Sequence, residues 1–209
     1  MKTLKDILKE SLLDDFGEQA KDLKHLQIEE WLDNNHNEDR ETWPLEYKIN
    51  KDYTIDIAYF VYRGKGNFPD FIQFNRCEVD FICNDRNMTS LRGCPKYVGE
   101  TFSCISNNLK TLKYGPSKAQ YYFCSNNHLK TLDFSPEKVI HFYCDRNYLE
   151  SLRGCPSIIS DALNCEDNRL MSLRDAPRNV KYIYCGRNPL SDEAIKWAED
   201  HLNAKEIKY

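Results

Sequence analysis

The sequence lacks a long apolar run, an export signal and a large excess of charge of one sign. No segment contains the roughly 18 consecutive apolar residues that a transmembrane helix needs. The opening, MKTLKDILKESLLDD, has acids and lysines where a signal peptide has its apolar core. The formal net charge of −4, from 29 basic and 33 acidic side chains, fits neither an acidic tail nor a strongly basic nucleic-acid binder. We therefore expect a cytoplasmic protein that does not contact a membrane.

Motifs of catalytic and metal sites are also missing. The sequence has no Cys-x-x-Cys, no His-Glu-x-x-His, no Gly-rich phosphate loop and no nucleophile elbow, and its five histidines follow no ligand pattern. The nine cysteines are an odd number in a chain without an export signal, which favours reduced thiols over disulfides. We expect no enzymatic activity, no cofactor and no metal.

What the sequence has is an internal repeat, in which six cysteines recur at intervals of 20 or 21 residues. These ladder cysteines are Cys83, Cys104, Cys124, Cys144, Cys165 and Cys185. An apolar residue stands two positions before and five positions after each ladder cysteine. After each of the first five ladder cysteines, leucine stands eight positions later and proline twelve positions later. Asparagine stands three after the last five. These columns predict a solenoid in which the residues around each cysteine form a short strand, stacked about 4.8 Å from the next in a single parallel sheet.

The repeat unit, aromatic-x-Cys-x-x-Asn-x-Leu-x-x-Leu-x-x-x-Pro, resembles the leucine-rich repeat with cysteine at the usual strand leucine. The segments SLRGCPKYV at 90–98 and TFSCISNNL at 101–109 resemble the cysteine-bearing short repeats of large tailed bacteriophages and their bacterial hosts. Residues 47–61 resemble the β-hairpin that precedes the repeats in that group. The resemblance implies an interaction scaffold and transfers no active site.

The fold class we expect is an α+β repeat solenoid of the leucine-rich-repeat type, with coils of 20–21 residues and a helical region at each end. Residues 1–45 are expected to hold two amphipathic helices and a polar linker. Residues 46–190 would form the β-hairpin and the solenoid, with a degenerate first coil twenty residues before Cys83 that puts Val61 in the aromatic column. Residues 191–209 would form a capping helix, since Ser191 and two acids precede an amphipathic stretch.

The ladder thiols are expected to point into the core, one for each coil. A row of this kind cannot surround an ion tetrahedrally, so we interpret the cysteines as small apolar filler that stays unbonded. The asparagine column is expected to satisfy backbone groups where the chain turns out of each strand.

The candidate binding surface consists of the residues one and three before each ladder cysteine, because these alternate with the buried positions and point away from the core. Aromatic side chains gather in this surface toward its C-terminal end, on a face expected to be concave. The predicted partner-binding residues are Tyr121, Phe123, His141, Tyr143, Tyr182 and Tyr184. Tyrosine can anchor a protein interface, but aromatic pairs on neighbouring strands also stabilise a sheet by themselves, and both interpretations stay open.

These observations favour a non-enzymatic protein-binding module, phage-derived, that binds a host or phage protein. Inhibition of a bacterial defence or regulatory protein is one form this function could take, in the host cytoplasm if a phage encodes the chain. The alternative is a structural component of a virion or assembly, anchored by the N-terminal helices. A single-strand nucleic-acid binder is a third class, which the absence of a basic groove disfavours. We expect neither a nucleic acid nor a small molecule as the partner.

Overall fold

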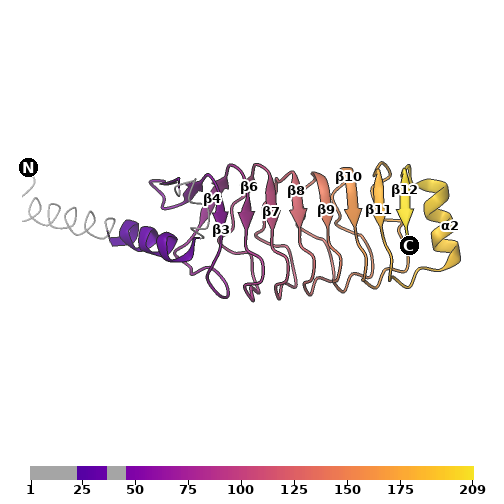
Figure 1. Ribbon diagram of the computed structural model, residues 1–209, viewed down its shortest axis with the longest axis horizontal. Coiled ribbons are helices and arrows are strands. Elements are labelled where there is room, and N and C mark those ends of the chain that lie inside the picture. The colour runs from indigo at the N-terminus through magenta and orange to yellow at the C-terminus, as the bar shows by residue number, and fades with distance from the viewer. Residues whose placement is uncertain (1–22, 37–45) are drawn as a thin grey trace, which may run out of the picture.

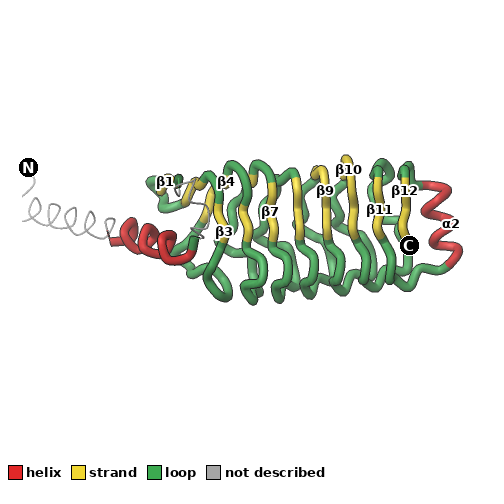
Figure 2. The backbone as a smooth tube through the Cα atoms, in the orientation of Figure 1, coloured by secondary structure: helices red, strands yellow, loops and turns green. Residues whose placement is uncertain are grey.

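The computed structural model describes residues 23–36 and 46–209, and these form a solenoid of stacked coils with a helix at either end (Figure 1). The first predicted helix and most of the polar linker lie outside the described residues, and the described helix includes residues 34 and 35 of that linker. Figure 2 shows short strands side by side along the solenoid, with the rest of each coil in loops and turns. The expected repeat solenoid with coils about 20 residues apart is confirmed.

The main element is an eight-stranded parallel sheet, here called the long sheet. Its strands, in spatial order, are β3 (Phe60–Val61), β5 (Phe81–Ile82), β7 (Thr101–Ser103), β8 (Tyr121–Phe123), β9 (Lys138–Tyr143), β10 (Ile158–Asn164), β11 (Tyr182–Tyr184) and β12 (Glu206–Lys208). Neighbouring strands pair in the register that the repeat predicts, with Phe102 opposite Tyr122 and Tyr122 opposite Phe142. Equivalent residues of successive coils therefore lie side by side.

A second sheet corrects the prediction of a single one. The strands β1 (Tyr47–Ile49) and β2 (Ile55–Ile57) form the expected antiparallel hairpin, and β4 (Phe74–Cys77) and β6 (Tyr97–Val98) extend it in parallel. The order of this four-stranded sheet is β1-β2-β4-β6. The hairpin is thus joined to the first coils by backbone pairing.

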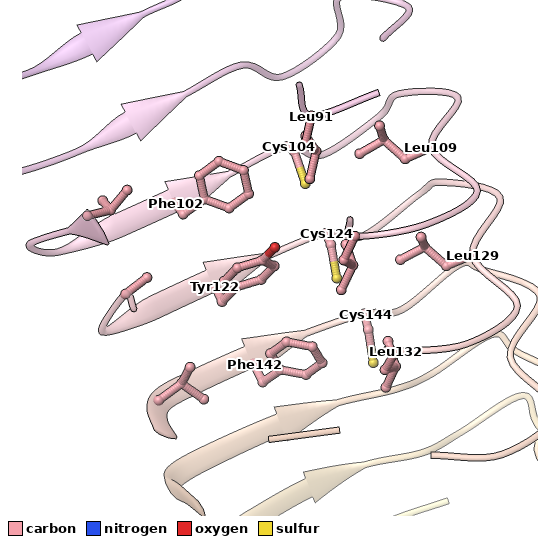
Figure 3. Close-up of a cluster of buried hydrophobic side chains, with 14 of the residues drawn as sticks. Leu91, Phe102, Cys104, Leu109, Tyr122, Cys124, Leu129, Leu132, Phe142 and Cys144 are labelled. Atoms are coloured by element: carbon pink, nitrogen blue, oxygen red, sulfur yellow. The ribbon is translucent and has the colours of Figure 1, made fainter. Parts of the chain in front are cut away.

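The repeat columns form the core between the strands and the returning half of each coil. The six ladder cysteines are buried and carry free thiols, as predicted. Figure 3 shows the cysteine, aromatic and leucine columns of three coils meeting in this core. Full burial of each large apolar side chain stabilises the fold by about 1.5–3 kcal/mol. Burial also raises the pKa of the Cys104, Cys144 and Cys165 thiols well above the usual value, so these groups stay protonated and unreactive.

One core column was missed in the sequence. A small or β-branched residue fifteen after each of the first five ladder cysteines is buried, at Val98, Ala119, Val139, Ile159 and Val180. It stands three residues after each proline of the repeat and closes the side of the core where the chain returns to the next strand. The proline therefore marks the beginning of a second inward-facing segment.

The asparagine column satisfies backbone groups in the turns, as predicted, and it also joins consecutive coils. The Nδ2 of Asn147 donates to the carbonyls of Cys144 and Cys124, both at 3.1 Å, and its Oδ1 accepts from the Leu129 amide at 2.9 Å. Asn107, Asn127, Asn168 and Asn188 make the equivalent bonds. Each amide thus satisfies backbone groups of two coils inside the turn.

The first coil departs from its predicted register by one residue. Phe60, and not Val61, pairs with Phe81, so Tyr62 occupies the cysteine column and is buried. The helix at residues 23–35 packs against this coil, where Trp31 contacts the rings of Tyr62 and Phe68. The core therefore continues into the N-terminal helix.

The apolar residues of this helix do not all face the core. Leu23 and Leu26 are 69% and 58% exposed, whereas Ile28 and Leu32 are fully buried with half-buried Trp31 beside them. Only the C-terminal part of the helix reaches the first coil.

At the other end the predicted helix is present as α2 (Asp192–His201). Ser191 caps it by accepting a hydrogen bond from the Ala194 amide at 3.2 Å, as expected. The chain then adds β12 parallel to β11, so residues 191–209 form a helix and a strand instead of a helix alone.

Candidate functional site

The six predicted partner-binding residues lie on the exposed face of the long sheet, and we call them the aromatic strip. β8 supplies Tyr121 and Phe123, β9 supplies His141 and Tyr143, and β11 supplies Tyr182 and Tyr184. All six are half-buried, whereas the residues between them in each strand are buried in the core. The alternation of a strand therefore presents the strip to solvent, as predicted.

Four of these side chains form a compact cluster across β8 and β9. The rings of Phe123 and Tyr143 have centroids 4.9 Å apart, and Tyr121 meets His141 edge to face at 5.2 Å. His141 also stacks on Tyr143 at 5.8 Å with an interplanar angle of 9°. The first two contacts are cross-strand pairs of the kind that stabilise a sheet, so at least part of the cluster has a structural role.

The strip continues across β10 to the two remaining tyrosines. Ala162 lies in register between His141 and Tyr182 and is only 5% exposed, so larger neighbouring side chains cover it. Asn164 lies in register between Tyr143 and Tyr184, and burial together with the nearby Tyr184 raises the pKa of Tyr143. The surface is thus one continuous strip over four strands.

An ion network borders the strip at the N-terminal ends of these strands. Asp161 receives a hydrogen bond of 2.9 Å from His141 Nε2 and one of 3.0 Å from Lys181 Nζ. These two partners lower the pKa of the Asp161 carboxyl, with Lys181 contributing most. The hydrogen bond to Asp161 holds the His141 ring, whose plane is nearly parallel to that of the Tyr143 ring.

Sequence reasoning missed Asp161, although the repeat contains a signal for it. The register of β9 and β10 shifts between Ile159 and Ala162, where β10 has one more residue than β9. This is the extra residue of the 21-residue interval between Cys144 and Cys165. The resulting bulge turns the Asp161 side chain toward His141.

Charges of both signs border the strip at the opposite ends of the strands. Asp145, Arg146, Glu166, Asp167 and Arg187 surround a hollow of about 160 Å³. The Lys208 ammonium lies 5.1 Å from the centroid of the Tyr184 ring. An aromatic centre with a mixed-charge border has the composition of a protein interface.

The described residues hold no grouping of three or more histidine, cysteine, aspartate or glutamate side chains that could bind a metal ion. No helix within residues 23–36 and 46–209 is long and apolar enough to cross a membrane. Neither a protein-family model nor a curated protein sequence matches this chain.

Proposed function

We propose that this protein is a non-enzymatic module that binds another protein through the aromatic strip. The observation that carries the proposal is the position of six aromatic side chains on a sheet face that the core does not use. Aromatic side chains with a polar atom, such as tyrosine and histidine, bury large apolar area in an interface and still form hydrogen bonds at its edge. Cross-strand stacking explains the aromatic residues on β8 and β9. It does not explain the two tyrosines on β11, because their partners on β10 are the small Ala162 and the polar Asn164.

The partner class follows from the border of the strip. A nucleic acid would call for a basic groove, whereas the charged side chains here are mixed in sign. A protein surface with its own mixed polar groups fits this border. The proposed phage origin, and with it a host or phage protein as the partner, rests on the resemblance of the coils to the cysteine-bearing leucine-rich repeats. Inhibition of a bacterial defence or regulatory protein is the form of this function that we propose to test first.

The test is affinity capture with the full chain from host lysate, with and without phage infection, followed by the same capture with variants. Phe123→Ala with Tyr143→Ala should abolish capture of the partner. Thr101→Ala is the matched control, because Thr101 occupies the same face on β7, outside the strip, and should leave capture unchanged.

The alternative of a virion or assembly component anchored by the N-terminus predicts the opposite pattern. A deletion of residues 1–22 would then abolish capture or assembly while the strip variants behave like the original protein. The deletion ends at residue 22 because Ile28, Trp31 and Leu32 belong to the core of the first coil. Loss of partner with this deletion, together with normal capture by the strip variants, would overturn the proposal.

A further inference from the structure

A second surface stands out on the half of each coil that returns from the asparagine turn to the proline. In this segment, six to ten residues after the ladder cysteine, the leucine at position eight points into the core and its neighbours face solvent. We call the solvent-facing residues of these segments the return face. The segments lie across the core from the strands, so the return face is separate from the aromatic strip (Figure 3).

Two aromatic residues on the return face have an unusual backbone. Tyr114 and Phe134, at the same position of adjacent coils, both have φ of 73°. The equivalent residues of the neighbouring coils on either side are Gly93 and Gly154, with φ of 94° and 83°. Glycine adopts this left-handed conformation freely, whereas a bulky side chain adopts it at a cost in free energy. Two coils therefore carry a large aromatic ring where the fold favours glycine.

Packing does not compensate for this cost. Tyr114 is 55% exposed and Phe134 is 59% exposed, so both rings present most of their surface to solvent. Strained residues that the core does not require are concentrated at functional sites. The rings are therefore better explained by a ligand than by the fold.

The charge around these rings indicates the chemistry of that ligand. The return face carries six exposed basic residues, Arg92, Lys110, Lys113, Lys130, Arg153 and Arg174, against three acidic ones. Among the described residues, Lys110, Lys113, Lys130 and Arg153 form no ion pair, and Lys113 Nζ lies 5.0 Å from the Tyr114 ring centroid. Lys110 and Lys130 stand four residues before the two rings, so each ring has a cation in the same coil.

From this arrangement we propose that the return face binds single-stranded nucleic acid. Two neighbouring bases stack on Tyr114 and Phe134, which occupy the same position of adjacent coils, and the lysines contact the phosphates. A lipid surface would need a continuous apolar face, but Thr111, Thr131 and Asp133 interrupt the rings. The absence of a basic groove led us to expect no nucleic acid as a partner, and this proposal departs from that expectation because the return face carries cations that form no ion pair among the described residues. These cations lie across the core from the sheet face.

The direct test is fluorescence anisotropy of the full chain with a labelled oligodeoxythymidylate of about 20 nucleotides. With three phosphate contacts, Kd should rise about 20-fold between roughly 50 and 200 mM salt. Lys110→Gln with Lys130→Gln should weaken binding and reduce the slope of log Kd against log salt from about 2 to about 0.7.

A second variant separates the ligand from the fold. Tyr114→Gly with Phe134→Gly introduces the residue that flanking coils already have, so thermal stability should not fall, while oligonucleotide affinity drops at least about tenfold. Phe123→Ala with Tyr143→Ala should leave this affinity unchanged. Unchanged affinity of the glycine variant, or binding that does not respond to salt, would overturn the proposal. Binding to phosphatidylserine vesicles without binding to the oligonucleotide would overturn it as well, in favour of a membrane surface.

Discussion

Phe123 and Tyr143 lie in register on neighbouring parallel strands, with ring centroids 4.9 Å apart and an interplanar angle of 35°. The same two side chains are candidates for interface anchors and for a cross-strand pair that stabilises the sheet. The two roles can be separated, because stacking contributes to the free energy of unfolding and anchoring contributes to the free energy of binding.

The first prediction measures the structural role. In a double-mutant cycle, Phe123→Ala and Tyr143→Ala should show a coupling of about 0.5–1.5 kcal/mol in the free energy of unfolding, as expected of a half-exposed aromatic pair. Urea unfolding followed by circular dichroism measures all four proteins. A coupling near zero would mean that the stacking does not stabilise the sheet.

The second prediction concerns the hydroxyl of Tyr122. This tyrosine stands in a column where Phe102 and Phe142 flank it, and its buried hydroxyl has no hydrogen-bond partner (Figure 3). Tyr122→Phe should raise the free energy of unfolding by about 1 kcal/mol, because it removes an unsatisfied polar group without leaving a large cavity. A loss of stability on urea unfolding would show that the hydroxyl has a partner, such as a buried water.

The third prediction tests the ladder cysteines. The thiol of Cys124 lies 3.4 Å from the Tyr143 carbonyl, at the distance of a weak S–H hydrogen bond, in surroundings that are otherwise apolar. Cys124→Ser should lower the free energy of unfolding by roughly 1–3 kcal/mol, toward the lower value if the hydroxyl keeps this bond. Cys155→Ser is the control, because Cys155 is only half-buried and off the ladder, and it should cost less. An equal loss in the free energy of unfolding for the two variants, measured by chemical denaturation, would argue against a special role of the ladder cysteines.

The fourth prediction uses the ion network beside the strip. Lys181 and His141 lower the pKa of folded Asp161 below its ordinary value of 3.8. The unfolded chain then binds the proton more readily, so the interaction stabilises the fold above the unfolded pKa and is lost as pH falls through the folded pKa. The difference in melting temperature between the original protein and Asp161→Asn should therefore be largest near neutral pH and shrink below about pH 4. A difference that does not depend on pH would exclude the network as its source.

Much of the fold could be predicted because its core is periodic. A column that repeats at a fixed interval fixes its own register, so Cys124, Asn147 and the six residues of the aromatic strip could all be placed from spacing alone. The asparagine turn followed from the need to satisfy buried backbone groups, which the bonds of Asn147 to Cys124 and Cys144 fulfil.

The other features of the fold and of the site depend on tertiary contacts, which the spacing of residues along the sequence does not determine. An extra residue is visible in the interval from Cys144 to Cys165, but its position at Asp161 depends on how β9 and β10 pair. The first coil was misplaced by one residue because Phe60 and Phe81 are 21 residues apart, whereas the prediction placed this coil 20 residues before the next one. The helix at residues 23–35 has apolar residues on more than one side, and only packing against the first coil selects Ile28 over Leu23.

The most direct test of the protein-binding proposal is a calorimetric titration of the captured partner into three folded proteins: the original chain, the Phe123→Ala/Tyr143→Ala variant and the deletion of residues 1–22. The account predicts that the double variant loses at least about 2 kcal/mol of binding free energy, the scale of an interface hot spot, while the deletion binds like the original. Normal binding by the double variant, with loss of binding in the deletion, would contradict the account and assign the interaction to the N-terminal segment.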